Sequence, residues 1–169
     1  MEENMSPVVE LWEIPQIELY MDQVTTFMDN KLSFYKRDEG EKVLTKTMIN
    51  NYAKEKLFPA PVKKKYSREH MMLLIIIYHL KSTLSISDIK RVLSPLNEAL
   101  SEEGGDRLLE KIYTEFTKMQ KNIIAGVEKE EEPAIFEETE IKSLLEVLRL
   151  SVMAEKAKME AERLIERDF

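Results

Sequence analysis

The chain has 169 residues and a formal net charge of −7, and 43% of its residues are hydrophobic, which is enough for one cored domain with or without a helical extension. It contains no cysteine, which excludes a disulfide framework, a catalytic thiolate and a zinc–cysteine cluster. Its four glycines and six prolines are too few for a turn-rich β-protein, so we expect an all-α fold.

The N-terminal segment, residues 1–15, is predicted to be irregular because it contains two prolines. Trp12 and Ile14 are expected to pack this strap onto the body of the protein. The segment lacks the basic-then-apolar pattern of a secretion signal, so we expect a cytoplasmic protein. The longest apolar run, residues 71–78, is far shorter than the ~20 residues that cross a bilayer.

Two helices are predicted in the next part of the chain. Residues 16–35 have apolar side chains three and four positions apart, which is the helical period. Residues 45–56 predict a second helix, because the Thr45 hydroxyl can accept a hydrogen bond from the amides of the first turn. The apolar side of this helix would leave the following polar residues facing elsewhere: Lys46, Thr47, Asn50, Asn51 and Lys54.

A basic segment and two further helices should follow. Residues 59–66 contain two prolines and three consecutive lysines, which predicts an extended basic connector. Residues 68–81, capped by Ser67, are apolar on nearly all sides, so this helix should be central. Ser85 then begins a short helix that Pro95 is expected to end or redirect.

The C-terminal half is predicted to be helical. Residues 106–127 form one expected helix, residues 128–133 an acidic break, and residues 137–167 a last helix. Between residues 141 and 159 the apolar side chains follow heptad-like steps of four and three. This stripe would either pair with a second chain or pack on residues 106–127 within one chain, and the sequence leaves both alternatives open.

Charge is unevenly distributed along the chain. Residues 1–41 carry a net charge of −7, residues 42–91 a net +8 and residues 92–169 a net −8. Because attraction to phosphate acts over roughly a Debye length, about 8–10 Å, the local charge matters more than the total. The central block therefore favours a nucleic-acid partner over the alternative, a solvated lysine-rich surface paired with acidic flanks.

The central block resembles the DNA-binding region of MerR-type transcription regulators over residues 44–93. Residues 44–59 are similar to the family's threonine-capped recognition helix, Lys64–Ser67 to its Arg-Arg-Tyr-Ser wing end, and Ser85–Lys90 to its Ser-Leu-x-x-Ile-Lys element. The resemblance implies a winged helix-turn-helix. Lys56 stands where the family has a glycine, and the glycine-free connector predicts a stunted wing.

The whole chain is still more similar to a family of Gram-positive bacterial proteins known as domain of unknown function 1836. The shared signatures are Ile49–Lys54, Lys64–His70 and Leu84–Lys90. This resemblance implies a DNA-binding regulator and brings no established activity with it. We therefore expect a strap and MerR-like helix-turn-helix module over residues 1–94, and a helical dimerisation or effector region over residues 95–169.

A helix of this kind can read DNA from the major groove, where an asparagine pairs with adenine and a lysine with guanine. Short polar side chains suit base edges, and lysines on the helix and connector suit phosphates, which position a protein without reading sequence. The predicted DNA-binding residues are Lys46, Thr47, Asn50, Asn51, Lys54, Lys63, Lys64, Lys65 and Arg68.

No other motif indicates chemistry, so we expect neither an enzyme nor a bound cofactor or metal. His70 is interpreted as a helix-start residue, and His79 has no metal-ligand partner on its own helix. The leading hypothesis is a transcription regulator that binds double-stranded DNA as a homodimer, with or without a small-molecule effector. The alternative is an all-α protein-interaction adaptor that keeps the helix-turn-helix shape without binding DNA.

Overall fold

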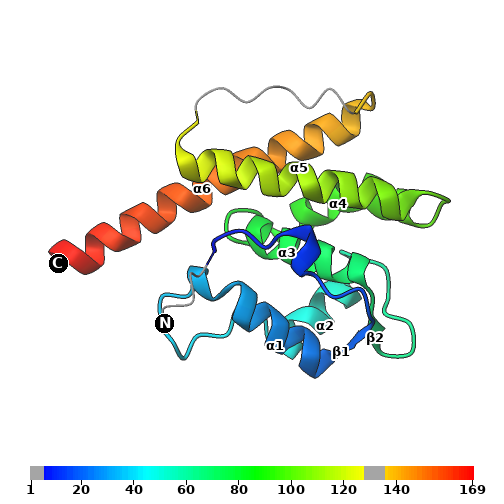
Figure 1. The fold of residues 1–169 in the computed structure, drawn as a ribbon, viewed down its shortest axis with the longest axis horizontal. Coiled ribbons are helices and arrows are strands. Elements are labelled where there is room, and N and C mark those ends of the chain that lie inside the picture. Colours follow the sequence, from blue (N-terminus) through cyan, green and yellow to red (C-terminus); the bar gives the residue numbers. More distant parts are fainter. Residues whose placement is uncertain (1–5, 128–135) are drawn as a thin grey trace.

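The computed structural model describes residues 6–127 and 136–169, and within them the protein is mainly α-helical, as predicted (Figure 1). The helices are α1 (Met21–Lys31), α2 (Lys46–Lys54), α3 (Arg68–Lys81), α4 (Ile86–Leu100), α5 (Gly105–Ala125) and α6 (Thr139–Asp168). One antiparallel two-stranded sheet, which the sequence did not predict, pairs β1 (Leu19–Tyr20) with β2 (Lys65–Tyr66).

Helix α3 forms the centre of the fold, as its apolar sequence predicted. It lies between α1 and α2 on one side and α5 and α6 on the other (Figure 1). All residues from His70 to Ile77 are buried. The helix begins at the predicted cap, because the Ser67 hydroxyl accepts from the His70 amide and the His70 ring nitrogen Nδ1 accepts from the Ser67 amide at 3.0 Å.

The N-terminal part differs from prediction in two ways. Helix α1 begins at Met21 rather than near residue 16, because Leu19 and Tyr20 are extended and pair with β2. In the strap, Ile14 is buried as expected, but Trp12 is 80% exposed, so the expectation that Trp12 packs on the body is wrong. Trp12 lies in a 3-10 turn, Leu11–Glu13, which directs its indole outward and Leu11 inward.

Helix α4 runs through Pro95, which was expected to end or redirect it. A proline inside a helix removes one hydrogen bond and costs about 3 kcal/mol. Burial of Leu93 and Leu96 on either side of the proline contributes a similar amount, at roughly 1.5–3 kcal/mol for each side chain. The expected boundary between residues 94 and 95 therefore falls within a helix, and one hydrophobic core includes residues from both sides of it.

Helix α6 packs within the chain. Its apolar side chains Ile141, Leu145, Leu148 and Val152 are buried, and the helix contacts α3, α4 and α5. Of the two alternatives for this stripe, the structure has the intrachain one. The C-terminal half of α6 extends beyond the body of the protein (Figure 1). The predicted acidic break at residues 128–133 lies outside the described residues.

Candidate nucleic-acid interface

Helix α2 carries the predicted recognition residues on one face. The Thr45 hydroxyl caps it by accepting from the Met48 amide at 3.1 Å, as predicted. Ile49 and Tyr52 point into the core, and Met48 and Ala53 are half-buried against it. The polar positions of the helix form one exposed strip. The polar residues of the strip lie one, four, five and eight positions after Lys46, and at 3.6 residues per turn these positions span less than half of the helix circumference. The exposed strip consists of Lys46, Thr47, Asn50, Asn51 and Lys54.

The cations of this face are not held by strong internal contacts. Lys46 pairs with Asp22, but both side chains are largely exposed, and an exposed pair of this kind is worth about 0–1 kcal/mol. Lys54 has no ion-pair partner among the residues that the structure describes. Both ammonium groups are therefore free to contact a ligand in the solvent.

The end of α2 has a backbone conformation that favours glycine, although a lysine occupies it. Lys56 has a φ of 59°, which is the left-handed region. The Leu57 amide donates to the Tyr52 carbonyl at 3.0 Å and the Lys56 amide donates to the Ala53 carbonyl at 3.0 Å, which is the Schellman arrangement. Glycine is favoured at this position, and a side chain there costs roughly 1–2 kcal/mol.

The basic connector, residues 59–66, contains a tight turn between the extended residues Val62 and Lys65, which pair with each other. Lys63 and Lys64 have φ values of 51° and 61°, and the Lys65 amide donates to the Val62 carbonyl at 2.9 Å. Two consecutive left-handed residues define a type I′ turn, which favours Asn-Gly. The prediction of an extended segment is wrong here because no glycine or asparagine indicates the turn. Both lysines are exposed at its tip.

Two predicted phosphate contacts are engaged elsewhere. The Arg68 guanidinium lies 2.6 Å from a Glu110 carboxylate oxygen and donates to the Leu11 carbonyl at 3.3 Å, with its side chain only 19% exposed. It fastens the strap to α5, so we remove Arg68 from the candidate interface. Lys65 is half-buried in β2, and its ammonium lies 5.6 Å from the centre of the Tyr20 ring.

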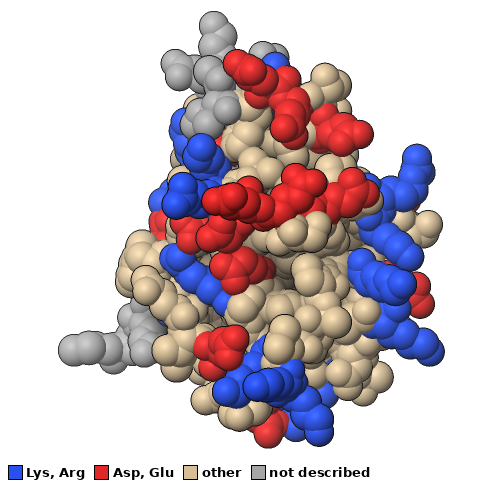
Figure 2. Space-filling model, turned by 90° about the vertical axis from the view of Figure 1, so that its right-hand side faces the viewer, with Lys and Arg blue, Asp and Glu red and all other residues tan. Residues whose placement is uncertain are grey.

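Charges separate on the surface of the folded protein. On the face drawn in Figure 2, Lys and Arg side chains gather at the lower end and along one side, and carboxylates concentrate in the upper half. Around α2 and the turn, the exposed cations are Lys42, Lys46, Lys54, Lys56, Lys63 and Lys64. The charge blocks of the sequence separate only in part. Among the described residues, three cations of the basic block pair with carboxylates of the acidic blocks: Lys42 with Asp29 at 3.5 Å, Lys46 with Asp22, and Arg68 with Glu110.

A buried polar cluster was not predicted. His79 Nδ1 lies 2.7 Å from Glu155 Oε2, and His79 Nε2 lies 3.3 Å from Gln120 Nε2, so the cluster joins α3, α5 and α6. All three side chains are buried. The one signal in the sequence is Glu155 itself, which continues the apolar spacing of Leu148 and Val152. In the part of the chain described, no group of three His, Asp or Glu side chains is placed to hold a metal ion.

Residues 9–116 match the model of the family described as Domain of unknown function (DUF1836), and the chain belongs to this family. The match includes α2, the Lys63–Lys64 turn and α3, so the candidate interface lies wholly within the family's domain. No curated protein and no solved structure matches the chain. None of the helices that the structure describes combines the length and apolar composition needed to cross a membrane.

Proposed function

We propose that this protein is a DNA-binding transcription regulator of the cytoplasm, built on a MerR-like winged helix-turn-helix, and that it is not an enzyme. Helix α2 is the recognition helix in the major groove. The sheet formed by β1 and β2, with the lysine turn leading into β2, is a short wing on the flanking backbone. The exposed strip of α2 supports this assignment, because it holds only lysine, threonine and asparagine and no carboxylate.

The observation that carries the proposal is the set of left-handed lysines, Lys56, Lys63 and Lys64. At each of these positions glycine or asparagine would be more stable. Backbone strain that persists in a native structure is found preferentially at functional sites. Here all three strained residues are exposed cations that flank α2 or form the turn, where a phosphate backbone would be contacted.

The chemistry of the side chains determines which of them contact bases and which contact phosphates. Asn50 and Asn51 are suited to adenine, to which an asparagine amide donates and from which it accepts. Thr47 is short enough for base edges at close approach. The lysines contact phosphates, so the affinity they supply falls as the salt concentration rises. The slope of log K against log salt concentration is about −0.9 for each phosphate contact.

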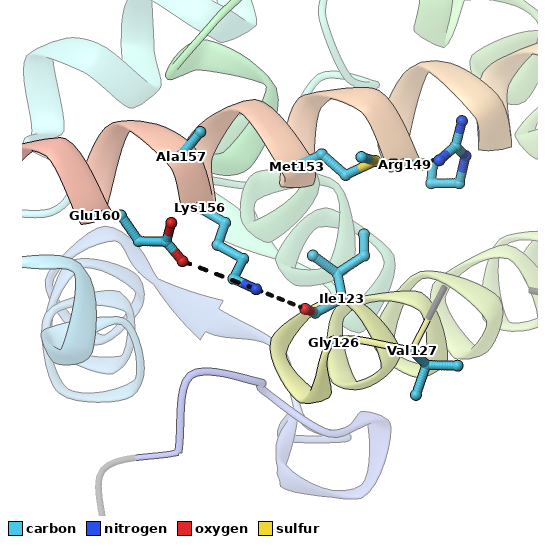
Figure 3. Close-up of a pocket in the computed structure, with 8 residues that line it drawn as sticks. All are labelled: Ile123, Gly126, Val127, Arg149, Met153, Lys156, Ala157 and Glu160. Atoms are coloured by element: carbon cyan, nitrogen blue, oxygen red, sulfur yellow. Dashed lines mark hydrogen bonds and ion pairs between the residues drawn. The ribbon is translucent and has the colours of Figure 1, made fainter. Parts of the chain in front are cut away.

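We further propose that the protein binds a two-fold symmetric site as a homodimer, because one short recognition helix provides limited affinity. The outer face of α6 offers an apolar surface, since Leu150 and Met153 are exposed beside Val127 at the end of α5. Met153 and Val127 border a groove of about 600 Å³, in which Figure 3 shows Lys156 reaching from α6 to the carbonyl oxygen of Ile123. A second copy would bury this face.

The experiment is selection of bound fragments from the source genome at two salt concentrations. The variant is Lys63→Glu with Lys64→Glu, and its matched control is Lys111→Glu with Lys118→Glu, which reverses two exposed lysines of α5. We expect enrichment of palindromic fragments by the wild type and the control, and loss of enrichment in the turn variant. Equal enrichment by both variants contradicts the assigned interface, and no enrichment by the wild type contradicts DNA binding.

The alternative, an adaptor for protein partners, is favoured by one observation. Trp12, Ile17, Tyr20 and Val62 are each more than half exposed, around the strap and the two-stranded sheet. Exposed apolar side chains of this size commonly mark interaction sites when they are contiguous. If genomic selection by the wild type fails, we expect Trp12→Ala to abolish capture of a protein partner, whereas the lysine turn variant leaves it intact.

A further inference from the structure

A cavity of about 210 Å³ lies where α2, the loop before it, the end of α3 and helix α6 meet. Its lining combines aromatic and apolar side chains with charged ones. Met48 and Tyr52 come from α2, Tyr78 and Lys81 from α3, and Glu155 and Met159 from α6. The cavity is therefore bounded both by the proposed recognition helix and by the C-terminal helix.

The Tyr52 side chain is the unusual feature of this cavity. It is 1% exposed, and its hydroxyl is buried without a hydrogen-bond partner among the described residues. Buried polar atoms nearly always have a partner, and an unsatisfied one destabilises the fold. Burial also raises the pKa of Tyr52, so the hydroxyl stays protonated at neutral pH and can donate. A ligand that accepts a hydrogen bond would satisfy it.

The carboxylates of the cavity are already engaged. Glu155 lies against His79 at 2.7 Å, Glu41 accepts from the Arg37 amide at 3.0 Å, and Glu162 lies 3.7 Å from the Arg37 guanidinium. Glu155 and Glu162 are thus engaged by side chains, whereas Glu41 is engaged by a backbone amide alone.

The groups without a partner in the described chain are the Tyr52 hydroxyl, the Tyr78 hydroxyl and the Lys81 ammonium. At neutral pH all three are hydrogen-bond donors, and one is positively charged. Burial, together with the negative charges of Glu155 and Glu41, raises the pKa of Tyr78, which keeps its hydroxyl protonated. The unmatched chemistry of the cavity is thus that of a site for a small anion.

We infer that this cavity binds a small organic carboxylate, with its carboxylate group on Lys81 and the two phenol hydroxyls and its apolar body between Met48 and Met159. The volume equals that of about seven liquid water molecules at ~30 Å³ each, which suits a benzoate or a branched-chain carboxylate and excludes a nucleotide. Apolar walls with a few convergent polar groups are typical of small-molecule sites.

The position of the cavity makes such a ligand a regulator of α2. Met48 and Tyr52 lie on the opposite side of α2 from Asn50 and Asn51, and the same cavity includes residues of α6. A ligand bridging the two helices would bias the placement of α2 relative to α6, and coupling of this kind is reciprocal for the two binding equilibria. This second part, unlike the ligand site itself, rests on the proposed DNA-binding function.

The first experiment measures binding to the full chain by calorimetry and thermal unfolding, with benzoate and isovalerate as probes and benzamide and benzylamine as matched neutral and cationic controls. We expect at least one carboxylate to bind saturably at millimolar concentration and to raise the Tm. Neither control compound should bind. No carboxylate binding, or preferential binding of benzylamine, overturns the inference.

Variants then locate the site. Tyr52→Phe keeps the ring and removes the hydroxyl, so we expect the carboxylate Kd to weaken about fivefold to tenfold while the Tm of the free protein stays the same or rises. Lys81→Gln should weaken binding by a similar factor, and Lys118→Gln on α5 should leave it unchanged. A Kd for the Tyr52→Phe variant equal to that of the wild type overturns the assignment.

A second experiment separates this inference from the proposed function. DNA affinity of the selected fragments is measured with and without the carboxylate, and we expect at least a fivefold change that Tyr52→Phe abolishes. Carboxylate binding without any DNA binding leaves the site standing and contradicts the proposed function. DNA binding with no carboxylate binding contradicts this inference alone, and binding of both without coupling contradicts its regulatory part.

Discussion

The His79 imidazole and the Glu155 carboxylate lie 2.7 Å apart although they are separated by 76 positions in the sequence. Their contact joins the central helix α3 to the C-terminal helix α6, and the imidazole is also packed edge-on against Tyr35 and Phe116. With Gln120, this pair forms a buried polar cluster in a mainly apolar interface, where a satisfied polar network favours one arrangement of the helices.

Removing one partner of this pair should be more damaging than removing both. We expect Glu155→Ala to lower the free energy of unfolding by about 3–5 kcal/mol, because it leaves the buried Nδ1 of His79 without its partner. Combining it with His79→Phe should restore much of the loss. Urea unfolding measures both, with Glu160→Ala on the exposed side of α6 as the control, expected within about 0.5 kcal/mol of the wild type. Equal loss in the single and double variants would contradict this account.

Stability should fall in mildly acidic solution through His70. Burial lowers the pKa of His70 below 6.5 in the folded protein, although its hydrogen bond to the Pro59 carbonyl opposes the shift. The unfolded chain therefore takes up this proton at a higher pH than the folded one, so stability is complete above pH 6.5 and declines as the pH falls below it.

The variant that checks this pH dependence is His70→Gln. Glutamine at the third helical position can maintain the reciprocal cap with Ser67 but cannot titrate. We expect the Tm of the variant to fall less than the Tm of the wild type as the pH is lowered from 6.5. Above pH 6.5 the two proteins should have similar Tm values. Identical profiles for the two proteins would show that His70 does not control this pH range.

The sequence predicts local structure well where the cause is local. The cap at Thr45 and the apolar spacing through Ile49 and Tyr52 were sufficient to place α2 and its exposed strip. Local signals did not predict the structure at Pro95 or at Lys63–Lys64. The helix through Pro95 is stabilised by burial. The turn at Lys63–Lys64 contains none of the residues that usually indicate a turn. At Pro95, tertiary packing outweighs local preference.

Long-range partners were not predictable from the sequence. Arg68 belongs by sequence to the basic block, but its guanidinium reaches Glu110 on another helix and the Leu11 carbonyl of the strap. Likewise, nothing near His79 in sequence indicates Glu155. A single sequence does not show which charged residues pair in the folded protein. Arg68 was therefore predicted to bind phosphate.

Because Arg68 is a structural residue, its replacement should affect stability and not DNA affinity. We expect Arg68→Met to lower the free energy of unfolding by about 1–3 kcal/mol, since Glu110 loses its partner and the strap loses a contact with α3. DNA affinity of the folded variant, measured well below its Tm, should equal that of the wild type. A large loss of affinity in the folded protein would return Arg68 to the interface.

Base reading is assigned to Asn50 and Asn51, whose exposed side chains make no hydrogen bond in the described part of the chain. We expect Asn50→Ala or Asn51→Ala to cost about 1–3 kcal/mol of binding to the preferred fragment and much less on other sequences. Stability should be nearly unchanged or slightly higher, since alanine favours helix. Fluorescence anisotropy on preferred and scrambled duplexes measures the difference, and equal losses on both would place the asparagines away from the bases.

The lysine turn permits a test in which stability and affinity move in opposite directions. Lys63→Asn with Lys64→Gly supplies the residues that a type I′ turn favours, so we expect the free energy of unfolding to rise by roughly 1–2 kcal/mol. The same change removes two phosphate contacts, so DNA affinity should fall and the slope of log K against log salt should become less steep by about 1.8. Urea unfolding and anisotropy titrations at several salt concentrations measure the two effects. Lys56→Gly, at the end of α2, should likewise stabilise the fold and reduce the salt slope by about 0.9. A turn variant that gains stability and keeps the wild-type salt slope would mean that the strained lysines are not held there for DNA.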